Sequence, residues 1–139
     1  MPEIHIHWMA VLVAALVGYF LGALWYSKVL FGKPWLALMG FTPEKMEECK
    51  KKGLAKNYVA MLVGKLLMAF VLAHVIAYSA AHSLFAGASV GFWCWLGFVA
   101  PVMLGSVLWE GKPVKLYVLN TGYYLAALVL MGAIFGIWS

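Results

Sequence analysis

The sequence predicts an all-α membrane protein, a four-helix transmembrane bundle formed by a single domain of 139 residues. Composition is the first observation, because 65% of the residues are hydrophobic and only 11% are charged. A soluble domain is about half apolar and about a quarter charged. The second observation is that four apolar stretches reach the roughly 20 residues that a spanning helix needs. The third is that the lysines gather between these stretches. Together these features exclude a soluble domain, a disordered chain and a disulfide scaffold.

The apolar stretches predict four spanning helices, at about 8–26, 57–78, 85–108 and 114–138. One long link joins the first two helices, and short links join the second to the third and the third to the fourth. Helices joined by short links pack as antiparallel neighbours. The sequence therefore predicts a compact bundle in which the last three helices run alternately up and down.

The long link has features of a helix of its own, at about 42–52. Thr42-Pro43-Glu44 has the composition of a helix N-terminus, and Lys50-Lys51-Lys52-Gly53 that of a helix C-terminus. We expect a short amphipathic helix on the membrane surface. It serves either as a topology anchor or, alternatively, in recognition of anionic lipids.

The placement of the lysines predicts the orientation of the protein. Seven of the ten lysines lie in the link 27–56 and two lie beside the link between the third and fourth helices. The N-terminal tail, the second link and the C-terminus contain none. Because cytoplasmic links carry the excess of positive charge, the link 27–56 is expected in the cytoplasm and both termini outside. No arginine is present, which argues against a nucleic-acid partner.

Small residues at every fourth position mark a packing face on the first helix: Ala10, Ala14, Gly18 and Gly22. Such stripes let helix backbones approach closely within a membrane. We expect this stripe to pack inside the bundle, with contact between copies in a homo-oligomer as the alternative. In the third helix, Gly97 lies four residues before Pro101, which predicts a kink because proline removes a backbone hydrogen bond there.

Three polar residues at similar depth form a candidate site: Lys65, Glu110 and Asn120. Polar groups inside a membrane are costly and are often functional. An ion pair between Lys65 and Glu110, bridged by Asn120, would make a proton or anion site. In the alternative interpretation, Lys65 extends its ammonium to the interface and Glu110 belongs to the turn.

The four histidines are all expected at the outer face: His5, His7, His74 and His82. Imidazole is a common metal ligand, so a metal ion or haem site is one hypothesis. No metal-binding motif accompanies the histidines, and interfacial histidines bonded to water or backbone are the favoured interpretation. The sequence also contains no catalytic motif of soluble enzymes. We therefore expect no cofactor and no enzymatic activity.

Two similar motifs indicate a tandem repeat of helical hairpins. Leu21-Gly-Ala-Leu-Trp25 precedes Gly32-Lys-Pro34, and Leu104-Gly-Ser-Val-Leu-Trp109 precedes Gly111-Lys-Pro113. Both copies would run in the same direction through the membrane. Chance similarity is the alternative, since each residue type is common near membrane interfaces.

Longer motifs resemble a known family. They are Leu21-Gly-Ala-Leu-Trp-Tyr-Ser27, Leu30-Phe-Gly-Lys-Pro-Trp35, Lys52-Gly-Leu-Ala-Lys56, Trp95-Leu-Gly-Phe-Val-Ala-Pro101, Gly105-Ser-Val-Leu-Trp-Glu-Gly-Lys-Pro113 and Asn120-Thr-Gly-Tyr123. Over nearly the whole chain they resemble domain of unknown function 1761. The resemblance implies a small, mostly bacterial membrane protein with four spans. It implies no activity, cofactor or site residue. Lys28 stands where that resemblance leads us to expect proline.

Three function hypotheses follow from these features. The first is a non-enzymatic membrane subunit that packs with the lipid bilayer, with itself or with a larger membrane complex. The second is a small oligomeric transporter or channel that uses the Lys65, Glu110 and Asn120 cluster. The third is the metal or haem site at the outer histidines.

Overall fold

The computed structural model describes residues 6–27, 30–39, 44, 48 and 55–138. Its helices, in chain order, are α1 (Trp8–Trp25), α2 (Gly32–Met39), α4 (Ala55–Tyr78), α5 (Leu84–Phe98), α6 (Ala100–Met103), α7 (Gly105–Leu108) and α8 (Val114–Trp138). The described residues contain no strand. Four helical segments are long and apolar enough to cross a membrane, namely α1, α4, Leu84–Leu108 and α8. The predicted all-α fold with four membrane spans is thus confirmed.

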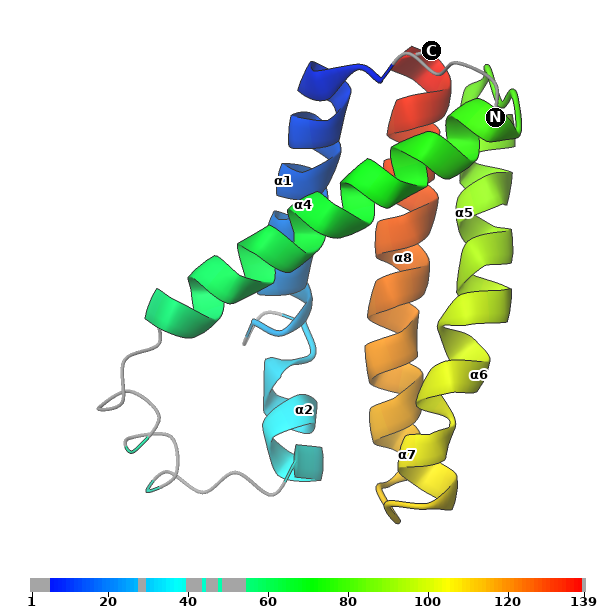
Figure 1. The fold of residues 1–139 in the computed structure, drawn as a ribbon. Helices are drawn as coiled ribbons and strands as arrows, with labels where there is room; N and C mark the ends of the chain where they lie inside the picture. The colour runs from blue at the N-terminus through cyan, green and yellow to red at the C-terminus, as the bar shows by residue number, and fades with distance from the viewer. Residues whose placement is uncertain (1–5, 28–29, 40–43, 45–47, 49–54, 139) are drawn as a thin grey trace.

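Three of the spans stand side by side, and the fourth crosses them obliquely (Figure 1). α8 lies between α1 and α5, and it also contacts α4. α4 rests mainly on α1 and α8, and it contacts α5 little although only a short link joins them. Its buried residues, Lys65, Ala69, Leu72, Ala73 and Ile76, all lie beyond its tenth residue. The first part of α4 therefore projects past the three-helix layer.

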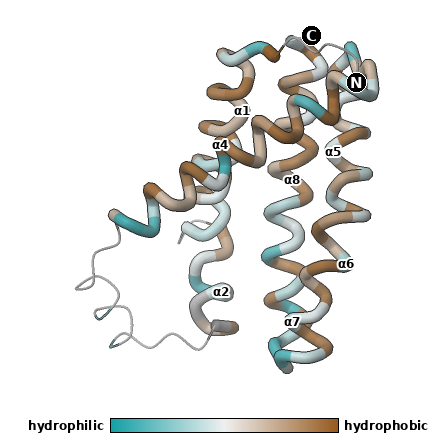
Figure 2. The backbone as a smooth tube through the Cα atoms, viewed as in Figure 1, coloured by the Kyte–Doolittle hydropathy of each residue, from teal (hydrophilic) through white to brown (hydrophobic). Residues whose placement is uncertain are grey.

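Hydropathy along the backbone agrees with this arrangement (Figure 2). The spans are hydrophobic over most of their length, whereas polar segments gather at the start of α4 and at the turn between α7 and α8. We refer to the start of α4 and the turn 109–113 together as the lysine-rich end.

α5 and α8 pack backbone to backbone through a glycine seam, formed by Gly87, Gly91, Gly132 and Gly136. A Cβ atom on Gly87 would collide with the carbonyl oxygen of Gly132, and one on Gly91 would collide with that of Leu128. Because backbone atoms cannot rotate away as side chains do, only glycine permits this approach.

The third span is interrupted rather than continuous. α5 ends at Phe98, Val99 adopts φ −114° and ψ −57°, and α6 begins at Ala100 with Pro101 in its first turn. This interruption falls between the two residues of the predicted kink, Gly97 and Pro101. The Tyr117 hydroxyl donates a hydrogen bond of 2.7 Å to the carbonyl oxygen of Ala100. α8 thus satisfies a backbone group at the interruption, as a span without water requires.

α2 is a helix that the sequence analysis did not predict. Pro34 lies in its first turn, where proline is tolerated because the N–H would be unpaired anyway. Gly32 allows the chain to fold back, since its N–H donates to the Ser27 carbonyl at 2.8 Å and a Cβ there would lie 2.6 Å from Ser27 backbone atoms. The predicted surface helix at about 42–52 lies outside the described residues, apart from Glu44 and Glu48.

The two copies of the repeated motif have different surroundings. The first Gly-Lys-Pro leads into the short helix α2, and the second leads into the spanning helix α8. Trp25 is partly buried and donates from its indole nitrogen to the Leu119 carbonyl at 3.1 Å. Trp109 is 88% exposed. Sequence similarity between the copies therefore does not extend to equivalent packing.

Candidate functional site

Lys65 is a buried charged residue in the middle of α4. Only 4% of its surface is exposed. Its Nζ lies 4.6 Å from the centre of the Tyr123 ring and 4.8 Å from that of Tyr124, both on α8. A Cβ atom on Gly18 would lie 3.8 Å from the lysine Cδ. The lysine stem thus lies within ordinary van der Waals distance of the Gly18 position, where α4 crosses α1.

No carboxylate balances this ammonium among the residues that the structure describes. Glu110 instead lies near another lysine, with its Oε2 3.8 Å from Lys112 Nζ. No hydrogen bond from the Lys65 ammonium to a described residue is formed either. Its neighbours are the faces of two aromatic rings, which attract a cation by up to about 2 kcal/mol each when water is excluded. Lys65 is thus a buried cation with aromatic contacts and no counter-ion in this described part.

Hydrogen bonds fix the aromatic side chains around Lys65. The Tyr123 hydroxyl donates to the Gly18 carbonyl at 2.7 Å, and the Tyr26 hydroxyl donates to Asn120 Oδ1 at 2.8 Å. The rings of Tyr26 and Tyr123 meet edge to face with centroids 5.6 Å apart. α1 and α8 therefore hold a rigid aromatic wall against which the lysine lies.

A cavity of about 520 Å³ opens beside Lys65. Its lining comes from α1, α2, α4, α8 and the turn after α1: Tyr19, Gly22, Ala23, Tyr26, Ser27, Trp35, Tyr58, Met61, Lys65 and Tyr123. Half of these side chains are aromatic, and Lys65 is the charged one. Tyr58 is 58% exposed and Met61 is 50% exposed. Both belong to the projecting part of α4, so the cavity is open on its α4 side.

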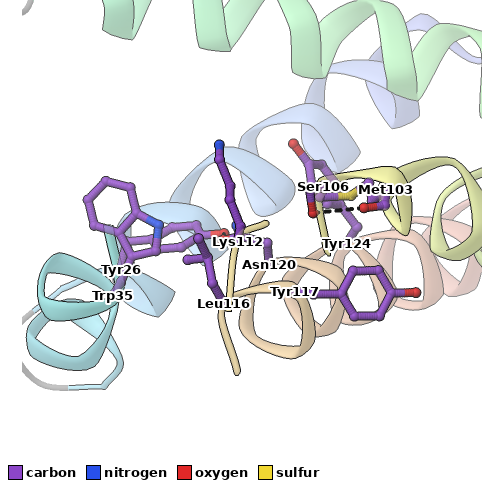
Figure 3. Close-up of a pocket in the computed structure, with 9 residues that line it drawn as sticks. All are labelled: Tyr26, Trp35, Met103, Ser106, Lys112, Leu116, Tyr117, Asn120 and Tyr124. Carbon is purple, nitrogen blue, oxygen red and sulfur yellow. Dashed lines mark hydrogen bonds between the residues drawn. The ribbon is translucent and has the colours of Figure 1, made fainter. Parts of the chain in front are cut away.

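A smaller cavity of about 300 Å³ lies nearer the turn between α7 and α8 (Figure 3). Its lining residues are Tyr26, Trp35, Met103, Ser106, Lys112, Leu116, Tyr117, Asn120 and Tyr124. Tyr26 and Trp35 line both cavities. Their rings lie with centroids 5.3 Å apart. The pair of rings and the Tyr26–Asn120 hydrogen bond therefore separate the two cavities.

The structure distributes the predicted polar cluster over three places. Lys65 contacts the tyrosines, Asn120 accepts the hydrogen bond from Tyr26, and Glu110 pairs with Lys112. Glu110 is 62% exposed in its side chain, because it follows the last residue of α7 in the turn. The predicted Lys65–Glu110 pair bridged by Asn120 is thus not among the contacts of the described residues.

Sequence reasoning missed the tyrosines that contact Lys65. Asn120, Tyr123 and Tyr124 are spaced by three and four residues and therefore share one face of a helix. That spacing, next to a lysine on another apolar helix, is the signal that points to an aromatic site. Tyr26 follows the last residue of α1, and its partial burial depends on α8, where it donates to Asn120.

The small-residue stripe of α1 packs within the chain. Ala10 and Ala14 are fully buried, and Gly18 is buried as well. A Cβ atom on Gly22 would lie 2.9 Å from the Tyr123 hydroxyl oxygen. The stripe thus faces α4 and α8, and contributes to the site through Gly18 and Gly22.

The histidines do not converge in the part of the chain that the structure describes. His7 and His82 are exposed, and His5 lies outside the described residues. His74 Nδ1 lies 2.8 Å from the Phe70 carbonyl oxygen in a hydrogen bond, and its ring packs on Phe70. No group of three metal-binding side chains occurs within these ranges.

Taken together, the fold defines an α-helical protein with four potential membrane spans and a buried lysine between a cavity and two tyrosines. The chain matches the family model described as "Protein of unknown function (DUF1761)" over residues 9–136. It therefore belongs to that family, as its motifs predict. No curated protein and no solved structure matches the chain significantly.

Proposed function

We propose that this protein is a non-enzymatic membrane protein that binds an anionic ligand in the cavity beside Lys65. The observation that carries the proposal is a cation that is 4% exposed, lines a cavity and has no acidic partner among the described residues. With the lysine-rich end in the cytoplasm, the site would belong to the inner half of the membrane.

The energy of a buried charge supports this proposal. A lysine at the centre of a spanning helix costs about 2.5–3.5 kcal/mol on insertion scales. A lysine that extends to the interface avoids most of this cost. Lys65 instead places its ammonium against the rings of Tyr123 and Tyr124. An anion bound in the cavity would supply the missing partner.

We expect the purified full-length protein to bind dodecanoate in a neutral maltoside detergent and to bind dodecanol much more weakly. A hydrogen bond to a charged group contributes about 1.5–3 kcal/mol. Lys65→Met should therefore weaken dodecanoate binding at least about tenfold, as measured by equilibrium binding of the radiolabelled acid. Dodecanol should bind both proteins alike.

Lys56→Met is the matched control for this experiment. Lys56 lies on the same helix but is exposed, so its loss should leave dodecanoate binding unchanged. Lys65→Met should also fold, because methionine replaces a buried cation with an apolar chain. Its unfolding temperature is expected to be equal to or above that of the parent protein. Equal dodecanoate binding by a folded Lys65→Met protein would refute the proposal.

Self-association is a second candidate function, and the projecting part of α4 favours it. This segment bears large apolar side chains that are half or more exposed, namely Tyr58, Val59, Met61 and Val63. The stripe of α1 is already occupied by α4 and α8. If copies associate, light scattering in mild detergent should give a mass above 15.3 kDa after subtraction of detergent. The double variant Val59→Asn with Val63→Asn should have a lower mass than the parent protein. A monomeric parent protein would contradict this candidate function.

A further inference from the structure

We infer that the ligand beside Lys65 is a lipid-borne monocarboxylate, a free fatty acid that enters the cavity from the bilayer. This inference rests on the proposed anion site and names the chemical class that the site selects. Three observations carry it: the few free donors in the cavity, the apolar wall, and an opening beside exposed apolar residues.

Three hydroxyl donors of the cavity are used inside the protein. The Ser27 hydroxyl donates to the Leu24 carbonyl at 2.6 Å. The hydroxyls of Tyr26 and Tyr123 donate to Asn120 and to Gly18. Lys65 therefore remains as the charged donor, with the hydroxyls of Tyr19 and Tyr58 lacking hydrogen bonds to described residues.

This small set of donors fits a carboxylate better than a phosphate. A carboxylate has two oxygens, which one ammonium and one hydroxyl can satisfy. A phosphate monoester or a glycerophosphate headgroup brings more oxygens, and each unsatisfied one is costly away from water. The cavity therefore favours a ligand whose headgroup has one charge and few polar atoms.

The opening of the cavity favours a ligand with an apolar chain. Tyr58 and Met61 are exposed where the cavity opens. Val59 and Val63 are exposed on the same segment of α4, which is among the segments apolar enough to cross a membrane. An acyl chain can thus remain among lipid chains while its carboxylate reaches Lys65.

The burial of Lys65 argues against the headgroup of an intact phospholipid. Only 4% of its surface is exposed, and it lies ten residues after Ala55, about 15 Å along the axis of a helix that runs obliquely to the other spans (Figure 1). A phospholipid headgroup at the interface would have to leave water and carry two chains with it. A fatty acid has one chain and becomes neutral on protonation, so it enters the apolar region at lower cost.

The test is competition against radiolabelled dodecanoate on the full-length protein in maltoside detergent, with four unlabelled competitors. They are dodecanoate, dodecyl phosphate, acetate and phosphatidylglycerol. Dodecanoate should compete at least about tenfold better than dodecyl phosphate. Acetate should compete at least about a thousandfold worse, because each buried methylene contributes about 0.8 kcal/mol. Phosphatidylglycerol should not compete. Lys65→Met should lose the binding for which these compounds compete, whereas the control Lys56→Met should give the same competition as the parent protein.

Each outcome separates this inference from the proposed function. If dodecyl phosphate or phosphatidylglycerol bound more tightly than dodecanoate and lost this binding in Lys65→Met, the inference of a carboxylate ligand would be overturned. The proposed anion site would still stand in that case. If acetate bound as tightly as dodecanoate, entry of an acyl chain from the bilayer would be contradicted. The proposed anion site beside Lys65 would still stand. Dodecanoate binding that Lys65→Met leaves unchanged would overturn both.

Discussion

Gly91→Ala and Gly132→Ala are each expected to destabilise the protein by about 3 kcal/mol or more. A Cβ atom at Gly91 would collide with the Leu128 carbonyl oxygen, and one at Gly132 with the Gly87 carbonyl oxygen. Overpacking usually costs about 1–3 kcal/mol when side chains can adjust. Here backbone meets backbone, so α5 and α8 must separate along the seam. Unfolding in a titration with dodecyl sulfate, followed by circular dichroism, measures the effect.

Two other glycines provide the matched controls for the seam. No atom lies within 4 Å of a Cβ built on Gly64 or on Gly97. Gly64→Ala and Gly97→Ala should therefore leave stability unchanged or raise it by up to about 1 kcal/mol through helix propensity. If Gly91→Ala were as stable as Gly97→Ala, the two helices would not pack as closely as described.

Tyr123→Leu is expected to lower the free energy of unfolding by about 2–4 kcal/mol. The substitution removes a buried hydrogen bond to Gly18, worth about 1 kcal/mol, and one ring over the Lys65 ammonium, worth up to about 2 kcal/mol. It also removes the ring contact with Tyr26, worth about 0.5–1.5 kcal/mol. Thermal or dodecyl sulfate unfolding measures the sum.

Two phenylalanine substitutions separate these contributions. Tyr123→Phe keeps the ring and loses the hydroxyl, so it should cost about 1 kcal/mol. Tyr124→Phe should cost little, because the Tyr124 hydroxyl has no hydrogen bond to a described residue. In a double-mutant cycle, Tyr123→Leu should be less costly in the Lys65→Met background. Equal costs in both backgrounds would show that the ring does not stabilise the ammonium.

The spans were predictable because length and apolar composition are local properties of the chain. The helix α2, by contrast, could not be predicted. It lies in the lysine-rich link, where Pro34 is compatible with the start of a helix and equally with a turn. The oblique course of α4 could not be predicted either. It depends on which residues meet at the crossing, such as Lys65 and Gly18, and periodicity does not encode such pairings.

The candidate site was predictable in part for a similar reason. Lys65 and Asn120 are conspicuous because polar residues are rare in apolar helices. Glu110 was paired with Lys65 on depth alone, but the end of α7 places it in an exposed turn beside Lys112. The tyrosines were missed because aromatic residues near the ends of spans are common at any membrane interface. Their burial arises from contacts between distant segments.

The glycine seam also divides the molecule into parts of different stiffness. α5 and α8 touch through backbone atoms, which leaves little freedom to slide or tilt. α4 is held through side chains such as Leu72 and Ile76 on one part of its length only. A change in the tilt of this one helix would widen or narrow the cavity beside Lys65. Because α4 is packed over Ala69–Ile76 and exposed at Tyr58, such a tilt would change access to Lys65 from the Tyr58 side.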